Sequence, residues 1–247
     1  MDNIDNERYV KNNKIALIGC INGIFLYDLL WPFLIVVIMK LILGSGYIPF
    51  VENNENLASS ILLVATSLIT LLIAIVVAGP KRLIKAYKSF EKGDIKLILS
   101  SFGIMLLFNY IYNFILLVSG VDIIGGNANQ SSVVELISSN AIMSFISMVI
   151  LAPVLEEITY RYFLYGGIAK YNRKWAIIIS GFIFMCVHAV ASFSPDVDNI
   201  FRELILLPPY MFSGIVLAYV YDKKENLLIS TSIHLLNNLI SFILCLI

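Results

Sequence analysis

Long apolar stretches, each able to cross a membrane, dominate the chain. The clearest one, LASSILLVATSLITLLIAIVVAG at 57–79, contains no charged residue. A helix needs about 20 mostly apolar residues to span the hydrocarbon core of a bilayer. The segments that meet this requirement are 15–43 (interrupted by Asp28 and Pro32), 57–79, 97–118, 141–161, 175–192, 200–221 and 227–247. We therefore predict an all-α fold, a polytopic transmembrane helical bundle of about seven spans.

The composition excludes several classes of protein. Hydrophobic residues make up 59% of the chain and charged residues only 14%, whereas a soluble domain has about 25% charged residues. So few polar residues cannot coat a soluble domain of this size. The formal net charge of zero implies no global electrostatic partner. We therefore exclude a soluble enzyme, a nucleic-acid-binding protein and a disordered chain, and expect the lipid bilayer as a partner.

Basic residues alternate between the connections that join these spans. Lys and Arg occur in the N-terminal tail and in 80–96, 162–174 and 222–226. The intervening connections, 44–56, 119–140 and 193–199, contain neither. Because basic loops stay in the cytoplasm, we predict a cytoplasmic N-terminus in a multi-pass protein of the bacterial plasma membrane. The segment 119–140, rich in Gly, Asn and Ser, is expected to be an ordinary outer loop.

Ionisable side chains within the spans are the candidate functional residues, because a charge inside a bilayer is costly and usually marks function. The only two histidines of the chain, His188 and His234, both lie in apolar spans. Arg202 and Glu203 lie near the outer end of the sixth span, where we expect them to snorkel to the interface.

The segment LAPVLEEITYR contains two acids and one base. Glu157 and Arg161 are four residues apart, so they share a helix face and are expected to form an ion pair. Glu156 points about 100° away and has no counter-charge nearby in sequence, so it can serve as a general base. Pro153 is expected to kink the helix and admit water. The alternative, a structural ion pair at a helix end, suits Glu157 and Arg161 better than Glu156.

The aromatic Phe184 lies one helical turn before His188, and the polar Asn238 lies one turn after His234. Phe184 and His188 share a face, so the ring can fix the imidazole; the alternative is a core histidine bonded to a backbone carbonyl. His234 and Asn238 also share a face, with Asn237 close by, and such donors suit a developing oxyanion. Interhelical hydrogen bonding, common for Asn and His in membranes, is the alternative here.

Together these segments resemble a known family. The EExxxR, FxxxH and HxxxN/D motifs of the CPBP family are matched, in order, by Glu156-Glu157-x-x-x-Arg161, Phe184-x-x-x-His188 and His234-x-x-x-Asn238. This family contains the type II CAAX prenyl proteases, the Abi proteins and bacteriocin-processing or self-immunity proteins. The resemblance covers about 141–247 and no signature is found in the first three spans.

The resemblance implies an intramembrane endopeptidase that hydrolyses a peptide bond of a membrane-associated protein or peptide. It implies that Glu156 and His188 activate a water, and that His234 and Asn238 stabilise the tetrahedral oxyanion. Phe184 and the ion pair of the first motif support the site. The family name does not identify the substrate. It could be a protein of the CAAX type or a leader-bearing peptide.

Zinc is the one cofactor that these residues could bind. Two His and one Glu form a known ligand set for catalytic zinc, so Glu156, His188 and His234 could hold this ion. Glu157 would then become the base. The HExxH spacing of common zinc proteases is absent, and we favour the glutamate-type mechanism over the metalloprotease mechanism.

We expect three parts of the chain: a cytoplasmic tail at 1–14, three membrane spans with their loops at 15–140, and a catalytic core of four spans at 141–247. Two other functions stay open. A non-catalytic immunity or scaffold protein on the same fold has no need of His188 and Glu156 together. A proton-coupled transporter could use buried Glu and His, but the chain shows no inverted repeat.

Overall fold

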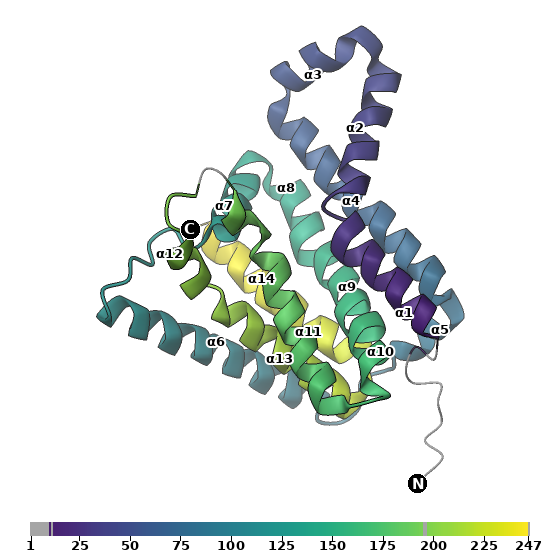
Figure 1. Ribbon diagram of the computed structural model, residues 1–247, viewed down its shortest axis with the longest axis vertical. Coiled ribbons are helices and arrows are strands. Elements are labelled where there is room, and N and C mark those ends of the chain that lie inside the picture. Colours follow the sequence, from purple (N-terminus) through teal and green to yellow (C-terminus); the bar gives the residue numbers. More distant parts are fainter. Residues whose placement is uncertain (1–9, 11, 195–196, 247) are drawn as a thin grey trace.

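The computed structural model describes residues 10, 12–194 and 197–246, and all regular elements in this part of the chain are helices (Figure 1). The predicted all-α fold is therefore confirmed. Most of the predicted tail at 1–14, including the basic Arg8 and Lys11, lies outside the described residues.

The helices fall into two groups along the chain. The first group is α1 (Asn13–Cys20), η1 (Ile21–Leu26), α2 (Leu30–Leu43), η2 (Gly44–Gly46), α3 (Tyr47–Asn53), α4 (Glu55–Ala78), α5 (Pro80–Ala86), α6 (Asp94–Val118) and α7 (Ala128–Ser139). The second is α8 (Ala141–Ser144), η3 (Phe145–Leu151), α9 (Ala152–Glu157), η4 (Ile158–Tyr165), α10 (Gly166–Ala169), α11 (Arg173–His188), η5 (Val190–Phe193), α12 (Ile200–Ile205), α13 (Pro208–Lys224) and α14 (Leu227–Cys245).

Six helical segments of the described chain are long and apolar enough to cross a membrane, against about seven predicted. They are Leu30–Asn53, Glu55–Ala78, Asp94–Val118, Ala141–Ala169, Ile200–Lys224 and Leu227–Cys245. Helix α11 has 16 residues, so at about 1.5 Å per residue it is shorter than the roughly 30 Å hydrocarbon core.

The first predicted span, 15–43, is two helices rather than one. The chain turns after η1, at the position of the exposed Asp28, and α2 begins two residues later. Pro32 lies in the first turn of α2. Backbone N–H groups there have no partner within the helix, so the N–H that proline lacks costs no helical hydrogen bond. Helices α2 and α3 then extend away from the bundle at the top of Figure 1.

The helix that contains the two acids continues through Pro153 rather than ending there. Pro153 is the second residue of α9, and π-helical turns lie on both sides of it, in η3 and η4. Such wide turns often occur at functional sites. Glu156 and Glu157 end α9 between the two π segments, so the expected distortion takes the form of widened turns.

The segment 119–140, expected to be an ordinary outer loop, contains the twelve-residue helix α7. The side chain of Asn127 begins it by accepting a hydrogen bond of 3.0 Å from the backbone N–H of Gln130, which is a common way to satisfy a helix N-terminus. The loop prediction was therefore wrong for the greater part of this segment.

Helices α11 and α13 cross at two glycines. A Cβ atom added to Gly214 would lie 2.8 Å from the Cα atom of Gly181 and 3.1 Å from the Cβ atom of Phe184. This close approach brings the C-terminal half of α11, which carries Phe184 and His188, against the N-terminal half of α13. The crossing thereby fixes one wall of the site described next.

Candidate active site

Glu157 is the buried centre of an ion-pair network between two helices. Its Oε2 atom lies 3.1 Å from Nε of Arg161, and its Oε1 atom lies 3.0 Å from Nδ1 of His234 on α14. The side chains of Glu157 and Arg161 are 0% exposed. The ion pair between Glu157 and Arg161 that was expected from the sequence is therefore present. The Glu157 carboxylate also holds the imidazole of His234, and this second partner helps to offset the cost of burying its charge.

Glu156 lies on the other side of the same imidazole. Its Oε2 atom is 3.7 Å from Nε2 of His234, and its side chain is 25% exposed. The sequence showed no counter-charge for Glu156, because this partner comes from a helix 78 residues further along the chain. His234 therefore stands between two carboxylates, one buried and one accessible.

His188 is held by a backbone carbonyl and two aromatic rings. Its Nδ1 atom lies 2.8 Å from the carbonyl oxygen of Phe184. A carbonyl only accepts, so Nδ1 carries the hydrogen and Nε2 of the neutral imidazole is free to accept a proton. The ring centroids of Phe184 and Tyr210 lie 4.4 Å and 4.5 Å from that of His188. Phe184 also meets His234 edge-on at 5.7 Å, so one aromatic ring contacts both histidines.

Asn238 follows His234 by one turn of α14. Its Nδ2 atom donates a hydrogen bond of 2.9 Å to the carbonyl oxygen of Met148, and its Oδ1 atom accepts one of 3.4 Å from Asn237. The amide is therefore fixed in orientation by η3 on one side and by its neighbour on the other. An Asn amide has two N–H groups, so one is left for a ligand.

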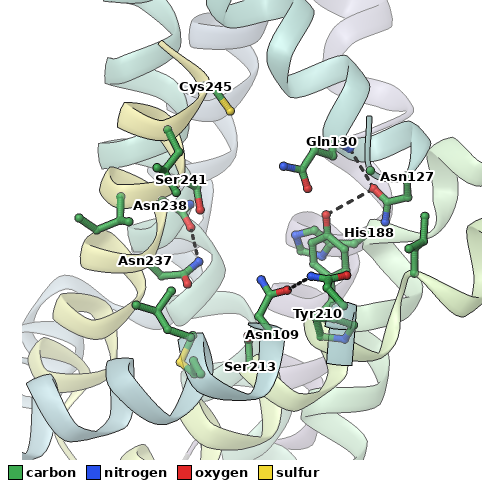
Figure 2. Close-up of a pocket in the computed structure, with 18 of the residues that line it drawn as sticks. Asn109, Asn127, Gln130, His188, Tyr210, Ser213, Asn237, Asn238, Ser241 and Cys245 are labelled. Atoms are coloured by element: carbon green, nitrogen blue, oxygen red, sulfur yellow. Dashed lines mark hydrogen bonds between the residues drawn. The ribbon is translucent and has the colours of Figure 1, made fainter. Parts of the chain in front are cut away.

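These side chains line one cavity of about 710 Å³. Glu156, Phe184, His188, His234 and Asn238 all contribute to its wall, whereas Glu157 and Arg161 lie behind it. Figure 2 shows Asn237, Asn238 and Ser241 of α14 on one side of the cavity, across from Gln130, Asn127 and Tyr210. The structure thus brings residues of all three sequence motifs to the wall of one cavity.

Residues 138–240 match the family described as type II CAAX prenyl endopeptidase Rce1-like. This segment is similar to the Rce1-like family. The match confirms the resemblance to type II CAAX prenyl proteases, and it covers the helices from α8 to most of α14. With the six apolar helices, it makes the chain a multi-pass integral membrane protein.

Similar proteins occur in bacteria. The UPF0177 protein YaiF of Lactococcus lactis subsp. lactis is 33% identical over 116 residues, which are 47% of this chain and 47% of that protein. The UPF0177 protein YxdF of the same organism is 29% identical over 85 residues, 34% of this chain and 40% of its own. An uncharacterized protein of Mycoplasma capricolum subsp. capricolum is 28% identical over 211 residues, which are 79% of this chain and 59% of that protein.

The chain spans about half the length of these curated relatives. No solved structure matches it. The bacterial origin of the relatives agrees with the predicted plasma-membrane location.

The candidate site includes residues that sequence reasoning missed. Tyr210, Asn127 and Gln130 line the cavity, as do Asn109 and Asn113 of α6. The last two stand four residues apart in an otherwise apolar span, and this spacing could have identified them as one polar face. Nothing in the sequence pointed to Tyr210.

Arg202 and Glu203 hold one wall of the cavity. The guanidinium of Arg202 donates to the carbonyl oxygens of Asp122 at 2.9 Å and of Ile124 at 2.8 Å. Glu203 accepts hydrogen bonds from the backbone N–H of Ala128 at 2.7 Å and from the hydroxyl of Ser192 at 3.0 Å. These two side chains therefore fasten α7 and the segment before it to the bundle, and their snorkelling to the interface stays a prediction.

The described residues of the candidate site are not arranged as a metal centre. In the described part of the chain, no three His, Cys, Asp or Glu side chains are close enough to hold a metal ion together. The Nδ1 atoms of His188 and His234 face the carbonyl oxygen of Phe184 and the carboxylate of Glu157, which leaves the Nε2 atoms for a ligand. Zinc binding by Glu156, His188 and His234 stays a prediction, and no step below runs through a metal.

Proposed function

We propose that this chain is an intramembrane endopeptidase that hydrolyses a peptide bond of a membrane-associated protein or peptide. The observation that carries the proposal is the meeting of Glu156, His188 and His234 at one cavity, with two carboxylates flanking one imidazole. Similarity to the Rce1-like family supports the same reaction class. A structural ion pair alone would need neither the accessible Glu156 nor the cavity.

Glu156 and His188 activate the water. The Glu156 carboxylate and Nε2 of His188 are both hydrogen-bond acceptors on the cavity wall, so together they can hold one water by its two hydrogens. The water oxygen attacks the carbonyl carbon of the scissile bond, and its proton passes to Glu156. When the C–N bond breaks, Glu156 returns this proton to the leaving amine.

His234 and Asn238 stabilise the oxyanion that the attack creates. In its protonated form His234 donates from Nδ1 to Glu157 and presents Nε2–H to the cavity. The second N–H of Asn238 supplies a further donor from the next turn of α14. Donors whose orientation is fixed before the reaction are worth most in catalysis, because nothing has to reorganise as charge develops. Glu157 and Arg161 therefore act by orienting His234.

The test is peptidomics of cells that produce the wild-type protein or Glu156→Gln. We expect a set of cleavage products that the wild type forms and the variant lacks, while both insert into the membrane to the same extent. Glu135→Gln is the matched control, because Glu135 is an exposed acid on α7 outside the cavity. Identical products from the wild type and Glu156→Gln would contradict the proposal. If Glu156→Gln also kept a wild-type immunity phenotype, the non-catalytic alternative would replace it.

A further inference from the structure

His188 stacks on Tyr210, an aromatic residue from a different helix. The two ring centroids lie 4.5 Å apart and the ring planes are within 28° of each other. Tyr210 is the third residue of α13, directly after Pro208 and Pro209. Proline at the start of a helix holds its backbone in a fixed conformation. The start of α13 therefore sets where the Tyr210 ring lies, independently of the helix α11 that carries His188.

The stacked ring restrains the imidazole in a way that its own helix does not. The hydrogen bond of 2.8 Å from Nδ1 of His188 to the carbonyl oxygen of Phe184 fixes one nitrogen of the ring. A ring held at one nitrogen can still tilt, and the tilt moves Nε2, the atom that accepts from water in the proposed reaction. An aromatic ring stacked on the imidazole opposes this tilt, because tilting breaks the contact between the two faces. The position of Nε2 therefore depends on the position of Tyr210.

The hydroxyl of Tyr210 ties the same ring to α7. Its oxygen accepts a hydrogen bond of 3.2 Å from Nδ2 of Asn129, and the hydroxyl donates one of 3.5 Å to Oδ1 of Asn127 (Figure 2). Both residues stand at the N-terminal end of α7, where Glu203 accepts the N–H of Ala128 at 2.7 Å. The hydroxyl oxygen of a tyrosine lies in the plane of its rigid ring, so moving the hydroxyl moves the ring. Direct contacts therefore lead from α7 to His188.

We propose that Tyr210 is a positioning residue for His188 and that its hydroxyl couples the placement of α7 to the water-activating end of the site. With α7 in place, Asn129 holds the Tyr210 ring against the imidazole. When the N-terminal end of α7 moves away, the ring loses this hold and His188 tilts. This inference rests on the proposed function, and it makes that function depend on a helix outside the three sequence motifs.

The imidazole of His188 can be observed directly, because the chain has only two histidines. NMR of the full-length protein in micelles, isotopically labelled on histidine, gives two imidazole rings to follow, and His188→Gln assigns them. A stacked aromatic ring shifts the signals of the hydrogens that lie over it. We expect Tyr210→Leu to shift the His188 signals, and Asn129→Ala to shift them in the same direction by a smaller amount. The signals of His234 should not move.

Kinetics separate a positioning role from a contact with the substrate. Tyr210→Leu should lower kcat for peptide cleavage about 10–100-fold, because it misplaces a group that must meet the water in a fixed geometry. KM should stay within about threefold of the wild-type value, because binding of the substrate is not affected. Tyr210→Phe keeps the ring and loses only the hydroxyl. It should therefore recover most of kcat, with a loss of at most about tenfold, the worth of one hydrogen bond.

Asn129→Ala tests the coupling to α7 from the other side of the hydrogen bond, since Asn129 does not line the cavity. It should lower kcat no more than Tyr210→Phe does. The double variant Asn129→Ala/Tyr210→Phe should lose no more than Tyr210→Phe alone, because both changes remove the same bond. Ser132→Ala is the matched control on α7: its hydroxyl bonds to the carbonyl oxygen of Ala128 within its own helix, at 3.0 Å. It should change neither kcat nor the His188 signals.

Unchanged His188 signals in Tyr210→Phe and Asn129→Ala would overturn the coupling to α7, and these two mild variants decide the question even if Tyr210→Leu fails to fold. A raised KM with a wild-type kcat in Tyr210→Leu would make Tyr210 a substrate contact and overturn the positioning role. Losses that multiply in the double variant would also contradict the inference. Absence of any Glu156-dependent cleavage by the wild type would overturn the proposed function instead, and the imidazole signals would still show whether Tyr210 positions His188.

Discussion

His234 is the residue on which the separate parts of the site converge. Glu157 holds one imidazole nitrogen at 3.0 Å, Glu156 lies 3.7 Å from the other, and Phe184 meets the ring edge-on. Its orientation therefore depends on a buried carboxylate that in turn depends on Arg161. This chain of contacts makes Glu157 the most consequential residue that does not itself reach the cavity.

Glu157→Gln should lower the free energy of unfolding by about 3–5 kcal/mol, because it leaves the guanidinium of Arg161 buried without its carboxylate. Unfolding by heat or denaturant in micelles measures the loss. The double variant Glu157→Leu/Arg161→Met should recover most of the stability and still fail to cleave peptides, because His234 stays unoriented. Wild-type stability of Glu157→Gln would show that the ion pair contributes nothing.

At the scale of the element, α7 and the glycine crossing of α11 and α13 build the walls of the cavity. Helix α7 is fastened at its N-terminus by Glu203, and the segment before it by Arg202. Few other polar contacts tie this helix to the bundle, so its attachment can be tested separately from the core.

Glu203→Ala removes the acceptor of the Ala128 N–H. We expect amide hydrogen exchange in 128–139 to become about tenfold faster or more, because a lost hydrogen bond to a charged group is worth about 1.5–3 kcal/mol. Exchange in α9 and α14 should not change. Glu135→Gln, an exposed acid on the same helix, is the control. Unchanged exchange in α7 would mean that Glu203 does not hold it.

Gly214→Ala tests the crossing of α11 and α13. The added methyl would stand 2.8 Å from the Cα atom of Gly181, so we expect the helices to separate and stability to fall by about 1–3 kcal/mol. Peptide cleavage should fall as well, because His188 moves with α11. Gly103→Ala on α6 meets nothing within 4 Å and should not destabilise the protein. Equal effects of the two variants on stability would refute the close crossing.

Contacts within one helix could be predicted from the sequence, and contacts between helices could not. The pairs Glu157–Arg161 and Phe184–His188 follow from a spacing of four residues. The bond between Glu157 and His234 joins residues 77 apart, and no spacing rule says which helices lie side by side. Helix α7 was missed because its Gly-, Asn- and Ser-rich surroundings are typical of a loop, although Asn127 was present as a helix cap.

On the scale of the whole molecule, the charges and the fold agree on an orientation. The helix α5 and the turn after α10, which carry many basic residues, lie at the lower right of the main bundle in Figure 1, whereas α7 and α12 lie at its upper left. The positive-inside rule then places the lower end in the cytoplasm. On this prediction, we expect the cavity wall formed by α7 to face the outside.

Cysteine labelling tests this orientation after the native Cys20, Cys186 and Cys245 have been replaced. Ser132→Cys on α7 should react with a membrane-impermeant maleimide on intact cells. Lys92→Cys, in the basic connection before α6, should react only after the membrane is permeabilised. The reverse pattern would place the N-terminus outside and contradict the predicted topology.

The rate of peptide cleavage by Glu156→Gln, His188→Gln and the double variant tests the central claim most directly. Each single variant should cleave about 10²–10⁴-fold more slowly than the wild type, as expected for a group that moves a proton in the reaction. The double variant should be no slower than the slower single variant, because the two residues act on one water. A wild-type rate for either single variant, or losses that multiply in the double variant, would contradict a shared hydrolytic site.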